Sequence, residues 1–172
     1  MKKRYLGIAI LVFIFLGIGI PISQGKKVPI KVKAPPALNF SSDTPSFMLS
    51  FSDFTSGSVS DTATVTYTIS ANKVKRDNNV VLAHLDSLFT GIDVEADMGP
   101  YTKVGGNASL VEVQAGYVVI PTSDVGLANK IKDKGSGKVV EGNFPITFRA
   151  VATEDLAAGN ETVTLVVTFI DT

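Results

Sequence analysis

The chain has 172 residues, with 16 Lys and Arg, 16 Asp and Glu, one His and no Cys. Its length predicts a single domain, and its balanced charge argues against a nucleic-acid binder, which needs a basic face for the phosphates. The absence of Cys excludes disulfides, thiolate metal sites and a cysteine nucleophile.

The N-terminus has the pattern of an export signal. The basic segment 2–4 precedes an uncharged apolar segment, 6–20, which stops at Pro21. The small residues of segment 23–25 offer a cleavage site, so residues 1–25 are predicted to be a signal peptide. An uncleaved anchor is the alternative, since about 17–18 apolar residues can just cross a bilayer. Both hypotheses predict a secreted, periplasmic or cell-surface protein, and an exported chain without Cys is typical of bacteria.

Residues 26–45 are expected to form an extended arm or linker. Val28, Ile30 and Val32 alternate with other residue types, which is the period of a half-buried strand. Such an arm can pair within its own domain, or it can add a strand to the sheet of a second copy or of another surface protein. We therefore predict that these three side chains lie in a groove, and both partners remain open.

Residues 46–172 are predicted to form one β-sandwich domain. The strongest strand pattern is TATVTYTIS at 62–70, where Thr and Ser alternate with apolar residues. Further strands are expected at 46–54, 92–97, 111–119, 144–153 and 161–171. About seven short strands with turns between them predict an all-β, antiparallel immunoglobulin-like sandwich.

One short helix is expected over 81–90. Val81, Leu82, Leu85, Leu88 and Phe89 recur at helical spacing, and a Gly at position 91 offers the C-terminal stop. Segments 99–107 and 129–138 are expected to be loops.

The apolar faces of the alternating strands predict the core. These residues are Val65, Tyr67, Val113, Tyr117, Ile146, Phe148, Leu165 and Val167.

Residues able to carry chemistry are few. His84 is the only histidine, and no nucleophile motif accompanies it, so a structural role is expected. Asp93, Glu95 and Asp97 alternate on one strand face and are weak candidates for a calcium site, although the rest of a calcium loop is missing. Tyr101 is the one candidate aromatic platform for a glycan.

The lysine-rich segment 129–138 is interpreted as a solvated loop. Its Gly-Lys spacing does not match a phosphate-binding loop. Neither a catalytic residue nor a cofactor is predicted.

The signal peptide, the strand at 62–70 and the C-terminal segment AGNETVTLVVTFIDT (158–172) together resemble secreted bacterial pilin-like and spore coat protein U-type domains. The chain differs from many members in having no Cys. The resemblance implies an exported, non-enzymatic structural or surface-assembly subunit that pairs through strands. An extracellular module that binds a glycan or calcium is the alternative hypothesis.

Overall fold

The computed structural model describes residues 27–33 and 39–170, and within 27–33 it describes the backbone together with the side chain of Ile30. The predicted signal peptide lies outside the described residues. The described part forms twelve strands and no helix. The strands are β1 Lys27–Lys33, β2 Asn39–Ser42, β3 Ser46–Ser50, β4 Ala63–Ala71, β5 Val81–Leu85, β6 Ile92–Met98, β7 Thr102–Gly106, β8 Ala108–Glu112, β9 Val118–Val119, β10 Val125–Lys132, β11 Val140–Ala152 and β12 Val163–Phe169.

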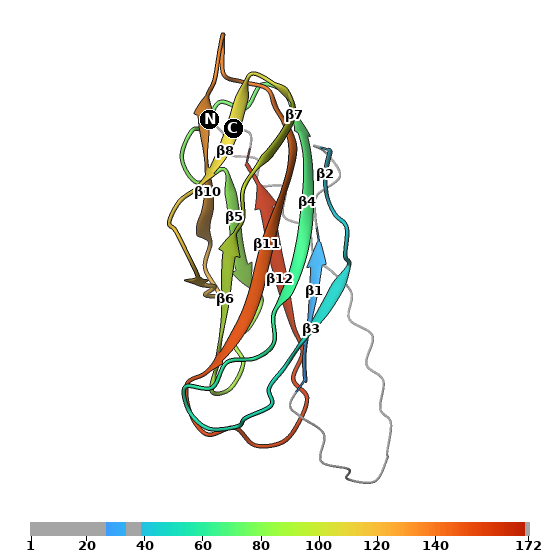
Figure 1. Cartoon of the computed structure of the whole chain (residues 1–172), viewed down its shortest axis with the longest axis vertical. Helices are drawn as coiled ribbons and strands as arrows, with labels where there is room; N and C mark the ends of the chain where they lie inside the picture. Colours follow the sequence, from blue (N-terminus) through green and yellow to red (C-terminus); the bar gives the residue numbers. More distant parts are fainter. Residues whose placement is uncertain (1–26, 34–38, 171–172) are drawn as a thin grey trace.

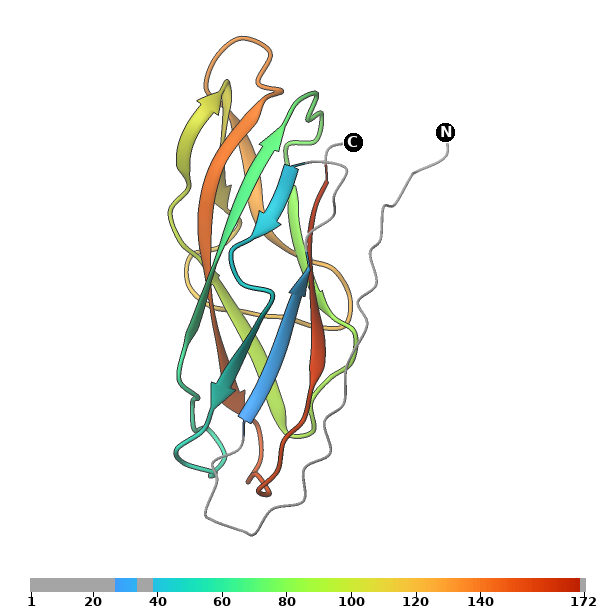
Figure 2. The same ribbon diagram turned by 90° about the vertical axis from the view of Figure 1, so that its right-hand side faces the viewer.

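All twelve strands belong to one mixed sheet that nearly closes on itself (Figures 1 and 2). Hydrogen-bonded neighbours follow the order β2-β4-β11-β8-β10-β5-β12-β1-β3; β6 and β7 also pair with β11, and β9 pairs with β6. The all-β class is confirmed. The expected number of strands was too low, and a purely antiparallel arrangement was wrong, because β1 runs parallel to β12.

The long strand β11 is the centre of the sheet. Its 13 residues alternate between buried and half-buried side chains along its whole length. It pairs with β4 from Val140, opposite Ala71, to Phe148, opposite Ala63. On its other side it pairs with β6 from Ile146 to Ala152. The strands expected at 62–70, 92–97 and 144–153 are therefore confirmed, and the last of these begins earlier than the sequence suggested.

The helix expected over 81–90 was wrong, because this segment begins with strand β5. β5 is hydrogen-bonded on one side to β10 and on the other to β12. Four of its five side chains are buried, so the run VLAHL is apolar on both faces of the strand. A continuous apolar run is typical of a buried strand as well as of a helix, and pairing on both edges decides the outcome here. After β5 the chain turns, leaving Leu88 exposed and Phe89 buried.

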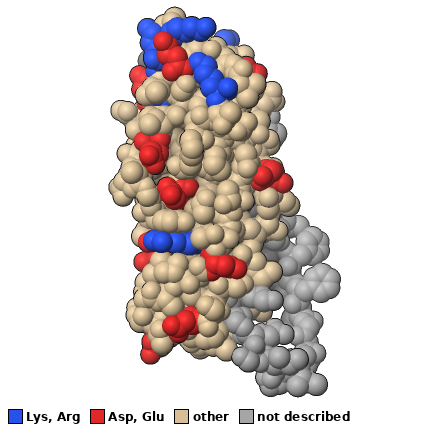
Figure 3. Space-filling view, viewed as in Figure 1, with Lys and Arg blue, Asp and Glu red and all other residues tan. Residues whose placement is uncertain are grey.

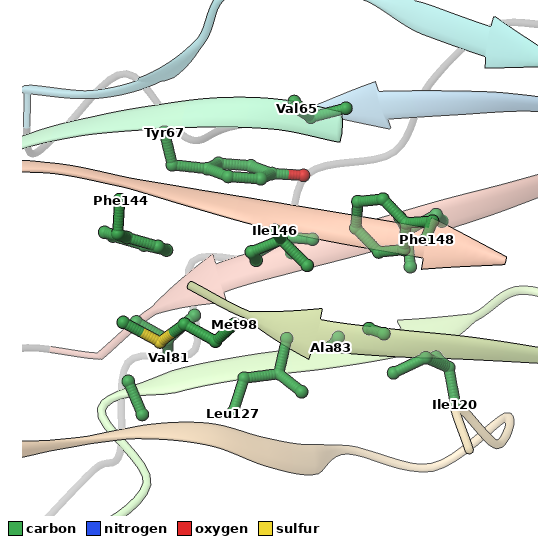
Figure 4. Close-up of a cluster of buried hydrophobic side chains, with 14 of the residues drawn as sticks. Val65, Tyr67, Val81, Ala83, Met98, Ile120, Leu127, Phe144, Ile146 and Phe148 are labelled. Carbon is green, nitrogen blue, oxygen red and sulfur yellow. The ribbon is translucent and has the colours of Figure 1, made fainter. Parts of the chain in front are cut away.

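The core lies between opposing parts of this folded sheet (Figure 4). Side chains of β4 and β11 face those of β5 and β10 across it. Phe40, Tyr67 and Phe144 form a triangle of rings, with Tyr67 5.5 Å from Phe40 and 5.7 Å from Phe144, and with Phe40 6.3 Å from Phe144 between ring centroids. Phe47 of β3 stacks on Phe148 of β11 at 4.9 Å. Aromatic contacts therefore join the two ends of the sheet, β2 and β3, to its interior.

Six of the eight predicted core residues are fully buried. The prediction that Val113 belongs to the core was wrong. Its side chain is 42% exposed, because Ala108 and Leu110 occupy the inward face of β8. Tyr117 is half-buried, since the chain leaves β8 before it and turns at Gly116 with φ of +81°.

Candidate functional site

The N-terminal strand β1 lies in the interior of the sheet, between β3 and β12. Ile30 is opposite Phe47 of the antiparallel neighbour β3 and opposite Val163 of the parallel neighbour β12. The Ile30 side chain is fully buried. The side chains of Val28 and Val32 lie outside the described part of the structure. Without β1, both β3 and β12 would present an unpaired edge, and the position of Ile30 would open to solvent.

His84 lies on β5, and its Nδ1 is 2.8 Å from Oδ1 of Asp124, which precedes β10. The sequence did not suggest this partner, because 40 residues separate the two. A carboxylate in this position orients an imidazole, as in a catalytic triad, but a triad also needs a hydroxyl on the second ring nitrogen. Among the described residues, the only side-chain hydrogen bond of His84 is the one to Asp124. The pair joins β5 to the residue that precedes β10.

The three acidic residues of β6 lie on one face, as their alternation predicted. Asp93, Glu95 and Asp97 are each half-buried. Glu95 is paired with Arg149, whose Nε donates to Oε2 over 2.6 Å, and the guanidinium stacks 3.8 Å from the ring centre of Tyr117. Carboxylates two residues apart on a strand are separated by about 7 Å, whereas calcium takes several oxygens at about 2.3–2.6 Å. In the described part of the chain, no three His, Cys, Asp or Glu side chains are grouped to hold a metal ion.

The lysine-rich segment 129–138 is only partly the solvated loop that was expected. Its first residues belong to β10, and Lys130 is buried, with 6% of its surface exposed. The Nζ of Lys130 donates to the carbonyl of Val74 over 2.9 Å and lies 2.9 Å from Oδ1 of Asp77. The backbone N–H of Lys130 also donates to the carbonyl of Asp77. The buried ammonium group therefore fastens the loop 72–79 to β10.

Tyr101 packs against β11 and does not stand free as a platform for a sugar. Its side chain is half-buried, and its hydroxyl is buried without a hydrogen-bond partner among the described residues. A Cβ at Gly142 would lie only 2.7 Å from that hydroxyl, so this approach requires glycine. Burial raises the pKa of Tyr101 to about 12. The segment that follows it, expected to be a loop, forms β7 and pairs with β11.

Comparison with models of known protein families and with curated protein sequences found no match for this chain. Among the described residues, no helix has the length and apolar character needed to span a membrane.

Proposed function

We propose that this protein is an exported, non-enzymatic structural subunit of a bacterial surface assembly, similar to a pilus or coat subunit. In this proposal residues 1–25 direct export, the domain is an immunoglobulin-like sandwich, and copies associate by exchanging the N-terminal strand. The observation that carries the proposal is the position of β1 between β3 and β12, with Ile30 fully buried.

A strand in this position can come from either of two chains. β1 contacts its neighbours through backbone pairing and a buried side chain, and a second copy can supply the same contacts. Because the contacts are equivalent, protein concentration decides between pairing within one chain and pairing between chains.

The composition of β1 also favours exchange. Pro29 has no N–H to donate, so the strand forms fewer ladder hydrogen bonds than its length allows. A strand that lacks this donor is held less firmly by its neighbours than one with a full set of ladder hydrogen bonds.

The alternative of a ligand-binding module has less support. Arg149 already neutralises Glu95 in the acidic row of β6, and the Tyr101 hydroxyl is directed into the protein.

Sedimentation velocity of the mature chain over a wide concentration range tests the proposal. At 300 mM salt, which screens contacts between charged surfaces, we expect concentration-dependent oligomers that Ile30→Asp abolishes, because a carboxylate cannot occupy the apolar site of Ile30 at low cost. Val119→Asp, at a half-exposed position of β9, is the matched control and should assemble normally. A chain that stays monomeric at every concentration would overturn the proposal, as would an Ile30→Asp variant that assembles as the wild type does.

A further inference from the structure

The two ends of the molecule carry opposite charge. Three segments, 72–79, 102–107 and 130–141, meet at one end of the long axis, which we call the cationic end (Figure 1). They contain eight of the nine Lys and Arg residues of segment 39–170, against three acidic residues, for a net charge of +5. In the space-filling view, most of the Lys and Arg on the visible face gather at this end (Figure 3).

Hydrogen bonds and an ion pair hold the cationic end together. The N–H of Val74 donates to the carbonyl of Lys138, and the buried Lys130 bonds to Val74 from the other side. Lys103 of β7 is paired with Asp133 of the neighbouring loop. Most of the remaining cations of this end are exposed to solvent.

Segments 52–62, 86–91 and 153–162 meet at the opposite end, which we call the anionic end. Together they hold six acidic residues and no Lys or Arg. The described residues of these segments therefore carry a net charge of −6.

Hydrogen bonds connect the three segments of the anionic end to one another. The N–H of Ser56 donates to Asp155, and that of Thr90 donates to Glu161. The N–H of Thr153 also donates to the carbonyl of Gly91. The carboxylates that take part are therefore fixed in position.

The two ends act as separate patches. β11 runs from one to the other, and its 13 residues span about 40 Å at roughly 3.3 Å per residue. This distance is several times the Debye length of about 8 Å at physiological salt, so neither charge cancels the other within one molecule.

We propose that copies of this chain stack end to end, with the cationic end of one against the anionic end of the next. This inference rests on the proposed function and specifies a second contact, separate from β1. The net charges of the two ends are nearly equal in size and opposite in sign. A second copy therefore provides a complementary surface for each end. A polyanionic partner would account for the cationic end alone. Each end also exposes two large apolar side chains that a stacked neighbour would cover: Val104 at 71% and Ile131 at 48% at the cationic end, and Leu88 at 63% and Val59 at 45% at the anionic end.

A head-to-tail contact of this kind uses two different surfaces and does not close by itself. Repetition therefore produces a filament and not a symmetric dimer. Because opposite charges across an interface steer association and are screened by salt, the assembly should be salt-sensitive.

Two sets of substitutions test the stacking. Lys132→Glu, Lys134→Glu and Lys138→Glu change the cationic end from +5 to −1 at exposed positions. Glu154→Lys, Ala157→Lys and Ala158→Lys change the anionic end from −6 to −2, also at exposed positions and without removing the carboxylates that bond to Ser56 and Thr90.

Light scattering and sedimentation at 20 mM and 300 mM salt provide the measurement. We expect the wild type to form longer species at low salt and its association to weaken roughly tenfold or more at high salt. Each variant alone should lose the long species. An equimolar mixture should regain salt-sensitive association limited to one end-to-end contact per molecule, because each variant retains one functional end.

Three results would overturn the stacking. They are a wild type that is monomeric at low salt, variants that assemble as the wild type does, and a mixture that regains no salt-sensitive association. If Ile30→Asp abolishes assembly while both charge variants retain it, end stacking fails and assembly through β1 stands. If the wild type is monomeric at low salt but binds polyphosphate through the cationic end, that end serves a polyanion and not a second copy.

Discussion

Replacing Phe148 by Ala tests the packing that closes the sheet. Phe148 is fully buried on β11, and its ring stacks on Phe47 of β3 at 4.9 Å with an interplanar angle of 20°. The residues beside it on the neighbouring strands, Ala63 and Ala96, are too short to fill the space that the ring would leave. Because the site cannot collapse, we expect a loss near the upper part of the usual range, about 4–5 kcal/mol in the free energy of unfolding.

Equilibrium unfolding in urea, followed by circular dichroism, measures this loss. Phe47→Ala is the comparison, because it removes the other ring of the stack from a half-buried position and should cost less. The double variant should show a coupling of about 0.5–1.5 kcal/mol between the two rings. A loss below about 1 kcal/mol for Phe148→Ala would refute the assigned core, since large-to-small changes at buried aromatic positions cost about 3–5 kcal/mol.

Three further predictions concern buried polar groups and pH. Tyr67→Phe should leave stability unchanged or raise it by about 1–3 kcal/mol in thermal or urea unfolding, because the Tyr67 hydroxyl is buried without a partner among the described residues. Lys130→Ala should destabilise the fold, and hydrogen exchange should speed up in the loop 72–79, because the Val74 carbonyl loses its donor; unchanged exchange there would contradict this. The pKa of Asp86 is lowered: burial acts to raise it, but hydrogen bonds from Thr164 outweigh burial. Its stabilising contribution is therefore present above about pH 4 and lost as the pH falls through the folded-state pKa, so Asp86→Asn should flatten the acid limb of the stability–pH curve.

The strands with strict alternation were predictable from sequence. β4, β11 and β12 carry Thr, Val, Ile and Phe at a period of two, and one face of each must be buried. The burial of Val65, Ile146 and Leu165 follows from that period alone.

Features that depend on strand pairing were not predictable. β5 has a sequence that suits a helix equally well, and only its two neighbouring strands decide the matter. A register shift between Gly126 and Ala128 of β10 breaks the simple alternation that would locate Lys130 on the inner face. The pairing of Glu95 with Arg149 depends on the register of β6 against β11, which no local pattern contains.

The candidate site was predictable in part. The alternation of Val28, Ile30 and Val32 indicated a strand, and the structure has a strand there with Ile30 buried. Its place between the third and the last strands, parallel to the last, could not be inferred, because a parallel partner can lie anywhere in the sequence.

Amide hydrogen exchange of the segment Lys27–Lys33, measured at several protein concentrations, tests the central claim most directly. The claim is that this strand completes the sheet and passes between copies. We predict slow exchange of these amides, with protection that increases as the protein concentration rises. Fast exchange at every concentration would contradict the account, because the strand would then not be held in any sheet.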